Sequence, residues 1–293
     1  MIEIIYNPVS GGNQKSRRTA EKVSQYLEAK GVPSVLRISE GPGHATELAK
    51  KAVQSGADAV AAVGGDGTVS ETACGLVYTN CPLLIIPAGT GNDFCKSVSI
   101  PSDPIQAAEL FFNGRQTVID MGQINERYFI NEVGAGFDVD VLRYSTKYKK
   151  HMSGLLPYLF GVFEALLKYH TFPLEMVNES GIAKTEDATV FSAANGKWIG
   201  GGINIAPEAE VTDGLLDFTV VRLIQKNRLP SRLAGLLKGK VLHFPETEHV
   251  KGLAYTISSP DLYVNIDGDI VRMETAVIRI VPKAIRIFCP VPQ

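Results

Sequence analysis

The first hundred residues alternate between continuous apolar runs and amphipathic stretches. Apolar runs at residues 2–6, 34–39, 57–63 and 83–87 predict short strands. Between them, residues 45–53 carry apolar side chains at the i, i+3, i+4, i+7 and i+8 positions of a helix. Strands that are apolar along their whole length are covered on both faces. The pattern therefore predicts an α/β domain built on a doubly wound parallel sheet.

The pattern changes near residue 120. The alternation of predicted strands and helices ends with a predicted helix at 103–114. Shorter strand-like runs separated by turn residues follow it. Two helical segments interrupt these runs, at about 145–170 and about 227–240. We therefore expect two domains, the first over residues 1–120 and the second mainly β.

Composition narrows the class of protein. The 293 residues include 45% hydrophobic and 20% charged side chains and carry a net charge of −2, so no electrostatic argument supports a nucleic-acid partner. The start, MIEIIYNP, lacks the pattern of a signal peptide, and we expect a cytoplasmic protein. The four cysteines have neither metal-binding nor disulfide-framework spacing.

Three glycine-rich turns each follow a predicted strand. They are NPVSGG at 7–12, GGDGT at 64–68 and PAGTGNDF at 87–94. The carboxyl ends of parallel strands meet at one edge of a sheet, and side-chain-free backbone ahead of a helix binds anions. The spacing of Thr68 and Glu71 also fits a capping box, but a cap would not explain three glycines in five residues. The turns predict a nucleotide site.

Asp66 stands inside the second turn. A carboxylate beside a polyphosphate is repelled unless a divalent cation lies between them, as in phosphoryl transfer. Asp66 therefore indicates Mg²⁺. The turns match neither the Walker P-loop nor the dinucleotide motif G-x-G-x-x-G.

The three turns, in this order, closely resemble the diacylglycerol kinase catalytic domain family, especially its bacterial lipid kinases. FINEVGAGFD at 129–138, APEAEVTDGLLD at 206–217 and VNIDGD at 264–269 extend the resemblance over nearly the whole chain. GGDGT alone is less specific, because NAD kinases also carry it. The resemblance implies an α/β domain like that of NAD kinases and phosphofructokinases. It also implies an antiparallel β-sandwich over 121–282, with a C-terminal strand at 283–293 returning to the first domain.

The resemblance implies ATP and Mg²⁺ as cofactors. The residues that it assigns to ATP are Asn7, Pro8, Val9, Ser10, Gly11, Ser39, Gly64, Gly65, Asp66, Gly67, Thr68, Val69, Ser70, Glu71 and Thr90. It also implies a structural Mg²⁺ held by the Asp213 side chain and by the carbonyl groups of Glu210 and Leu215. From the residues alone, VTDGLLD is an ordinary Asp-Gly turn.

Two carboxylates receive catalytic roles from the same resemblance. Asp66 would position the catalytic Mg²⁺, directly or indirectly, and Asp269 would be the base for the acceptor hydroxyl. The family usually has glutamate at the second position, so the carboxylate of Asp269 is one methylene closer to its backbone.

The implied activity is that of an ATP- and Mg²⁺-dependent lipid kinase. It would transfer the γ-phosphoryl group to a lipid hydroxyl, with diacylglycerol, giving phosphatidic acid, as the leading acceptor. One alternative is a soluble phosphotransferase like an NAD kinase, which explains NPVSGG and GTGNDF poorly. Another is a nucleotide- or lipid-binding regulator without turnover, which the change at Asp269 allows.

Residues 143–169 combine basic and apolar character. Four basic residues, Arg143, Lys147, Lys149 and Lys150, precede the apolar segment. That segment, 153–169, is too short and too interrupted to span a bilayer. We expect it to bring the protein transiently to the inner, anionic face of the membrane, where the lipid substrate lies. The alternative is a helix packed on the second domain. The oligomeric state is open, and a homodimer is compatible with the sequence.

Overall fold

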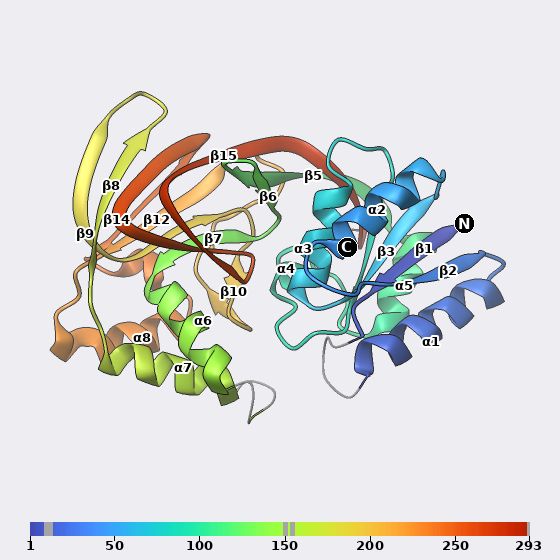
Figure 1. The fold of residues 1–293 in the computed structure, drawn as a ribbon, viewed down its shortest axis with the longest axis horizontal. Helices are drawn as coiled ribbons and strands as arrows, with labels where there is room; N and C mark the ends of the chain where they lie inside the picture. Colours follow the sequence, from blue (N-terminus) through green and yellow to red (C-terminus); the bar gives the residue numbers. More distant parts are fainter. Residues whose placement is uncertain (9–13, 149–151, 153–155, 292–293) are drawn as a thin grey trace. The chain divides into compact units, whose positions relative to one another are not determined.

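The structure is a computed structural model, and it describes residues 1–8, 14–148, 152 and 156–291. The chain forms two compact units (Figure 1). The first contains Met1–Asp120 and Pro282–Gln293, and the second contains Met121–Val281.

The first unit is built on a parallel sheet. Its strands lie in the order β4-β3-β1-β2. Their bounds are β1 (Ile2–Tyr6), β2 (Ser34–Ile38), β3 (Ala59–Gly64) and β4 (Leu83–Pro87). Every residue of β1, β3 and β4 is buried, as their continuous apolar runs predict, whereas the edge strand β2 is half-exposed. The predicted strands at 2–6 and 83–87 are confirmed to the residue.

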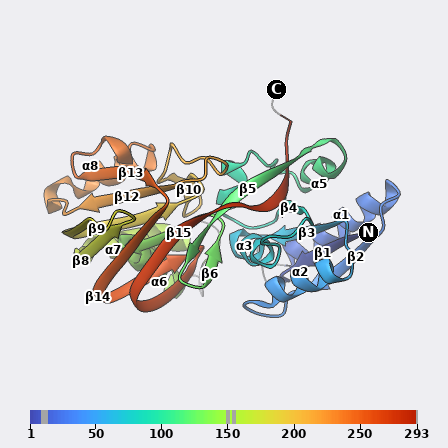
Figure 2. The same cartoon turned by 90° about the horizontal axis from the view of Figure 1, so that it is seen from above.

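Helices cover both faces of this sheet, which confirms the doubly wound fold. The helices are α1 (Lys15–Ala29), α2 (His44–Gln54), α3 (Asp66–Gly75), α4 (Asp93–Ser97) and α5 (Pro104–Asn113). α1 contacts α5 on one face, and α2 contacts α3 on the other (Figure 2). The sequence pattern did not predict α4, which has only five residues.

Gly75 allows α3 to pack closely on α2. A Cβ atom at Gly75 would lie 2.5 Å from the carbonyl oxygen of Thr46 and 2.6 Å from Cβ of Ala49. Real Cβ atoms do not make such contacts, so glycine is required at this crossing. The crossing fixes α3, whose first turn carries the GGDGT motif.

The second unit is an antiparallel β-sandwich, as the resemblance implies. Its strands are β5 (Arg115–Ile124), β6 (Arg127–Phe129), β7 (Glu132–Gly136), β8 (Phe172–Asn178), β9 (Ala183–Ala194), β10 (Trp198–Ile199), β11 (Ile203–Asn204), β12 (Leu216–Arg222), β13 (Thr247–Gly252), β14 (Ala254–Ile266) and β15 (Asp269–Cys289). The main path runs β13-β12-β9-β7-β14-β15, and β8 pairs with both β9 and β14. Apolar side chains from eight of these strands form one buried cluster. β5 begins in the first unit, and β15 ends there beside β4, with Ile287 opposite Leu83.

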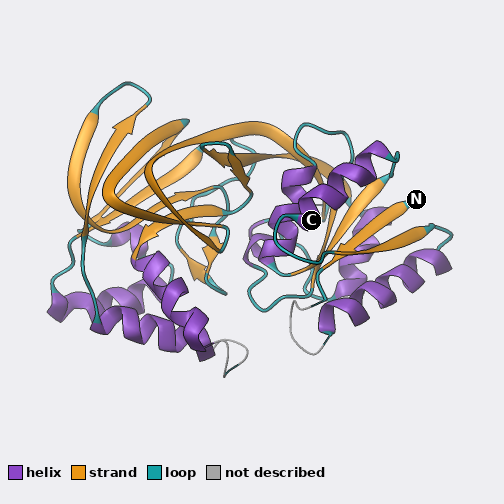
Figure 3. Cartoon of the chain, viewed as in Figure 1, coloured by secondary structure: helices purple, strands orange, loops and turns teal. Residues whose placement is uncertain are grey.

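Within the described residues of this unit, three helices and two short 3₁₀ turns interrupt the strands (Figure 3). The helices are α6 (Phe137–Tyr148), α7 (Leu156–Leu167) and α8 (Leu229–Leu237), and the turns are η1 (Lys226–Arg228) and η2 (Val241–His243). The expected helix start near residue 145 was wrong, because Val139 and Val141 alternate with polar residues as a strand does. No helix in the described ranges is long and apolar enough to cross a membrane.

Candidate functional site

The register of the first sheet brings its strand ends together. Tyr6 lies opposite both Ile38 and Val63, and Gly64 lies opposite Pro87. The backbone N–H of Ser39 donates to the carbonyl of Tyr6 at 2.8 Å. The segments that follow all four strands therefore start at one edge of the sheet, as predicted for a doubly wound fold.

Close backbone packing explains most of the glycines at this edge. A Cβ atom at Gly64 would lie 2.5 Å from Oγ1 of Thr68, and one at Gly89 would lie 2.4 Å from Cα of Gly65. The second and third glycine turns thus pack backbone against backbone. Gly67 differs, because it is exposed and a Cβ atom there would meet nothing within 4 Å. Its surroundings leave open space beside the first turn of α3.

The N-terminus of α3 is suited to binding an anion. The helix begins at Asp66, with the extended residue Gly65 as N-cap, and no side chain of the described residues caps it. Its first backbone N–H groups therefore point outward without a side-chain acceptor. The alternative explanation of Thr68 and Glu71 as a capping box does not hold: Thr68 lies inside the helix, and Oε2 of Glu71 accepts the N–H of Ala45 in α2 at 3.2 Å.

Asp66 joins the second glycine turn to the third. Its carboxylate accepts the backbone N–H groups of Asn92 (2.9 Å), Asp93 (2.6 Å) and Phe94 (3.4 Å) at the start of α4. Burial, and then the charge of Asp93, raise the pKa of Asp66, while the three N–H groups act in the opposite direction. Asp66 is therefore an anchor for the backbone of GTGNDF.

Asn92 completes the third turn. It adopts a left-handed conformation with φ of 49°, which asparagine tolerates better than most residues. Its Oδ1 accepts the N–H of Gly89 at 3.1 Å, and its Nδ2 donates to the carbonyl of Gly89 at 3.2 Å. The side chain thus closes the loop whose start Gly89 packs against Gly65.

The other residues assigned to ATP fall into three groups. Asn7, Pro8, Gly65, Glu71 and Thr90 are half-buried or exposed, whereas Ser39, which follows β2, is buried. The side chains of Val69 and Ser70 are buried within α3. Val9, Ser10 and Gly11 lie outside the described residues. The role of each in binding ATP stays a prediction.

A two-residue hairpin presents Asp269. Asp267 and Gly268, with φ of 48° and 104°, connect β14 to β15 and leave Ile266 opposite Asp269. An Asp-Gly pair with both residues at positive φ is typical of a two-residue hairpin turn. The side chain of Asp269 is 70% exposed and pairs with Arg127 at 3.1 Å. The hairpin therefore holds this carboxylate on a rigid element, open to a substrate.

Asp267, the first residue of the triplet Asp267-Gly268-Asp269, has a structural role. The Asp267 carboxylate accepts the backbone N–H groups of Ile130 (2.8 Å), Asn131 (3.0 Å) and Glu132 (2.9 Å). These three residues open the FINEVGAGFD motif. Asp267 thus fixes the hairpin to the strand that the motif forms, and Asp269 is the carboxylate left for chemistry.

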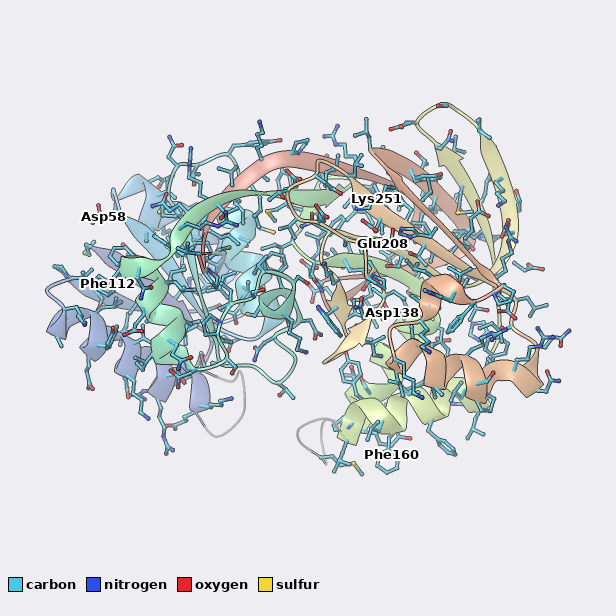
Figure 4. All side chains as sticks on the ribbon, turned by 180° about the vertical axis from the view of Figure 1, so that it is seen from behind. Asp58, Phe112, Asp138, Phe160, Glu208 and Lys251 are labelled. Carbon is cyan, nitrogen blue, oxygen red and sulfur yellow. The ribbon has the colours of Figure 1, made fainter. Side chains whose placement is uncertain are left out.

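A buried polar layer beneath the hairpin was missed from the sequence. Nδ2 of Asn265 donates to Oδ2 of Asp138 at 2.8 Å, and Oδ1 of Asn265 accepts the N–H of Gly268 at 2.8 Å. Burial raises the pKa of Asp138, against the effect of Asn265. Asp138 is half-buried, on the first turn of α6 (Figure 4). In the sequence, the carboxyl groups that interrupt the apolar motif FINEVGAGFD could have indicated this layer.

The ammonium group of Lys251 lies beside the Asp213 loop. Oδ2 of Asp213 lies 2.7 Å from Nζ of Lys251, which also donates to the carbonyl of Glu208 at 2.8 Å (Figure 4). Oδ1 of Asp213 accepts the N–H of Leu215 at 3.0 Å. Burial lowers the pKa of Lys251, but its bond to Asp213 and the charges of Asp217 and Asp213 outweigh this and raise it. The ammonium group is therefore charged.

The donor chemistry of this loop nevertheless fits Mg²⁺. The buried Asp217 approaches Lys251 only to 3.4 Å and His249 to 3.2 Å, long distances for charge-assisted hydrogen bonds. Two carboxylates therefore share one lysine. The surrounding groups that could bind a metal ion do so through oxygen atoms, the ligands that Mg²⁺ prefers. No three His, Cys, Asp or Glu side chains of the described segments form a metal cluster, so carbonyl groups would complete the ligand set. Asp213, Glu210 and Leu215 would hold the ion, in competition with Lys251.

Comparisons with known proteins agree with this architecture. A model of the diacylglycerol kinase catalytic domain matches residues 2–124, and a model of the YegS C-terminal NAD kinase beta sandwich-like domain matches residues 131–289. A diacylglycerol kinase of Staphylococcus aureus (strain bovine RF122 / ET3-1) is 32% identical over 270 residues, covering 91% of this chain and 85% of that protein. A diacylglycerol kinase of Mycobacterium tuberculosis (strain ATCC 25618 / H37Rv) is 29% identical over 296 residues, covering 99% and 95%.

Solved structures support the fold alone. A crystal structure from Bacillus anthracis str. Sterne aligns with a TM-score of 0.80 at 24% identity, covering 98% of this chain and 96% of that one. Another from the same organism, named a diacylglycerol kinase, has a TM-score of 0.72 at 22% identity and the same coverage.

We predict that Asp66→Asn lowers both stability and turnover. An amide nitrogen in place of one oxygen would face the N–H donors of residues 92–94, and an unsatisfied buried group costs about 1–3 kcal/mol. Denaturant unfolding measures the first effect, and steady-state kinetics with ATP the second. Because Asp66 is also assigned to Mg²⁺–ATP, we expect turnover to fall by about 10²-fold or more.

Asn92→Gly is the matched control for Asp66. It keeps the left-handed backbone and the charge of Asp66 but removes the side-chain bonds to Gly89. If the two variants lose the same turnover, Asp66 acts only by holding the turn, and its assignment to the metal is wrong.

The second prediction concerns Lys251 and Mg²⁺. An ion bound only by the folded state stabilises it by mass action, by about 2.7 kcal/mol at a concentration 100-fold above its Kd. Mg²⁺ should therefore raise the melting temperature, and Lys251→Met should enlarge this rise because the competing ammonium is removed. Asp213→Ala should abolish it. If neither Mg²⁺ nor a chelator changes the melting temperature of the parent and of Lys251→Met, the metal assignment is refuted.

Proposed function

Because this chain belongs to the diacylglycerol kinase catalytic domain family, we propose that it is a lipid kinase dependent on ATP and Mg²⁺. It transfers the γ-phosphoryl group to the free hydroxyl of diacylglycerol and yields phosphatidic acid. The relatives support the kinase activity. The choice of a lipid acceptor rests on the second unit.

The donor half of the proposal is supported by the edge of the parallel sheet. The start of α3, which no side chain of the described residues caps, supplies backbone N–H groups for phosphate, and Asp66 holds the third turn beside them. The exposed Gly67 leaves that approach open. Mg²⁺ bound with ATP would neutralise charge on the phosphates as the phosphoryl group moves.

One observation carries the lipid acceptor: the second unit contains a pocket with almost wholly apolar walls. α7, α8 and the strands beside them line it, with side chains that include Leu166, Ile224, Leu233, Leu236 and Phe244. Arg232 also reaches the pocket, but its guanidinium pairs with Glu246 at 2.9 Å. The cavity is small, about 50 Å³, and its apolar walls suit part of an acyl chain. They do not suit the polar ribose and phosphates of a nicotinamide nucleotide, the acceptor in the NAD kinase alternative.

Asp269 supplies the base in this proposal. Its carboxylate accepts the proton of the acceptor hydroxyl as that oxygen bonds to the γ-phosphorus, and the bond to the β-phosphate oxygen breaks to release ADP. The pairing with Arg127 limits the rotamers of the Asp269 side chain. The shorter aspartate side chain is thus compensated in part by a fixed position.

The direct test is incubation with labelled ATP and a panel of acceptors, followed by chromatography of the products. We expect label in phosphatidic acid when diacylglycerol is present and Mg²⁺ is supplied. Label in a nicotinamide nucleotide would favour the soluble phosphotransferase. Binding of ATP without transfer to any acceptor would favour the regulator.

The base assignment predicts the effect of Asp269→Asn. We expect kcat to fall by about 10²- to 10⁴-fold, the usual contribution of a positioned base, with ATP affinity unchanged. The melting temperature should stay the same, because exposed ion pairs contribute at most about 1 kcal/mol. Asp269→Glu, the usual residue of the family, should retain substantial activity.

Asp261→Asn is the control for that variant. Asp261 is equally exposed in the same strand pair and also pairs with an arginine, Arg272, at 3.0 Å. It should turn over at the parental rate. Equal kinetics for Asp269→Asn and Asp261→Asn would refute Asp269 as the base.

A further inference from the structure

The outer face of α7 is apolar and exposed. Leu159, Phe163 and Leu167 are 61%, 61% and 71% exposed, and Leu156 and Phe160 lie on the same side of the helix. Their spacing of three to four residues places all five on one stripe. The side chain of Phe160 points away from the body of the unit (Figure 4).

Small residues make the inward packing of α7. Gly161 and Ala165 are buried, and a Cβ atom at Gly161 would lie 2.7 Å from the carbonyl oxygen of Val141 in α6. The large side chains are therefore not required for packing on α6. Single exposed apolar residues are ordinary, but five on three turns of one helix form a patch.

Lysines border this patch. Nζ of Lys147 and Nζ of Lys168 lie 3.1 Å and 2.6 Å from the carboxylate of Glu164 and 4.6 Å and 4.7 Å from the ring centre of Tyr144. The hydrogen bonds from Lys168 and Lys147 lower the pKa of Glu164 to about 2. Glu164 is the one acidic residue of α7, so two lysines outweigh it.

The neighbouring charges keep the border positive. Arg143 is exposed and lies 4.6 Å from the ring centre of Tyr263. Asp140, on the same helix, lies 3.6 Å from His170. An apolar stripe with a cationic border is complementary to a bilayer that contains anionic lipid.

The helix that carries the patch also lines the proposed acceptor pocket. Leu166, on the last turn of α7, lines that pocket together with α8. Leu237, at the end of α8, is exposed and precedes the exposed Lys238. A bilayer on this face would bring acyl chains beside the helices that line the pocket.

We propose that the outer face of α7, with its lysine border, is the surface by which the protein docks on an anionic bilayer that holds its substrate. This inference rests on the proposed function for the nature of the substrate. A second copy fits the face less well, because a symmetric contact would bring each lysine border against itself. Docking would confine the search for a lipid acceptor to two dimensions.

The test uses sedimentation with vesicles of phosphatidylcholine, with and without phosphatidylserine. Leu159→Ser/Phe163→Ser should weaken binding to the anionic vesicles by about tenfold or more, because both side chains would leave the acyl boundary. Leu253→Ser/Ile182→Ser removes two exposed apolar residues elsewhere in the same unit and should bind like the parent. Neither residue of the first pair lines the pocket, so transfer to a dispersed short-chain diacylglycerol should be unchanged.

A charge variant tests the border separately. Lys147→Gln/Lys168→Gln should weaken binding to anionic vesicles but not to neutral ones, and should reduce the dependence of binding on salt. Parental binding by both double variants would overturn the proposal. So would a dimer, measured by analytical ultracentrifugation, that dissociates in Leu159→Ser/Phe163→Ser. If the parent binds vesicles but phosphorylates no diacylglycerol, docking stands and the proposed function fails.

Discussion

The contact between two backbone turns, at Gly65 and Gly89, is the constraint on which the donor half of the site depends. A Cβ atom at Gly89 would lie only 2.4 Å from Cα of Gly65, so the two turns can pack this closely only with glycine at this position. Asp66 then fixes the pair through the N–H groups of residues 92–94. A phosphate at the start of α3 would therefore meet N–H groups already in position, which is the condition for electrostatic stabilisation without reorganisation.

The second unit uses the same physical device. Asp267 binds the N–H groups of residues 130–132 as Asp66 binds those of residues 92–94. In each case the carboxylate accepts hydrogen bonds from backbone N–H groups of a loop. The contact therefore does not depend on the side chains of that loop. Beside each anchor lies the group assigned to chemistry, the start of α3 in one unit and Asp269 in the other. This division explains why two aspartates stand within three residues in the Asp267-Gly268-Asp269 triplet.

Local pattern was sufficient for the buried strands of the first unit but not for these anchors. Strands 2–6 and 83–87 were predicted to the residue, because a buried parallel strand needs nothing but a short apolar run. The partners of Asp66 lie 26 to 28 residues away and have no periodic signature. The Thr68–Glu71 spacing suggested a local cap, yet Glu71 bonds to a different helix. The hairpin at Asp267 was predictable from Asp-Gly, but which of its carboxylates would be engaged depends on a strand more than 130 residues away.

The helix α7 shows a different kind of departure from the ordinary pattern. A surface helix normally turns its large apolar residues inward, since each one buried contributes roughly 1.5–3 kcal/mol. Here Gly161 and Ala165 face inward and Leu159 and Phe163 face outward. The small residues bring α7 close to α6 and leave the large ones without burial in the isolated chain. Side chains arranged in this way contribute little to the stability of the fold in water. The hydrophobic free energy of burying them can therefore be gained when they contact another apolar phase. In the proposed function the acceptor is a membrane lipid, so that contact and access to the substrate would be the same event.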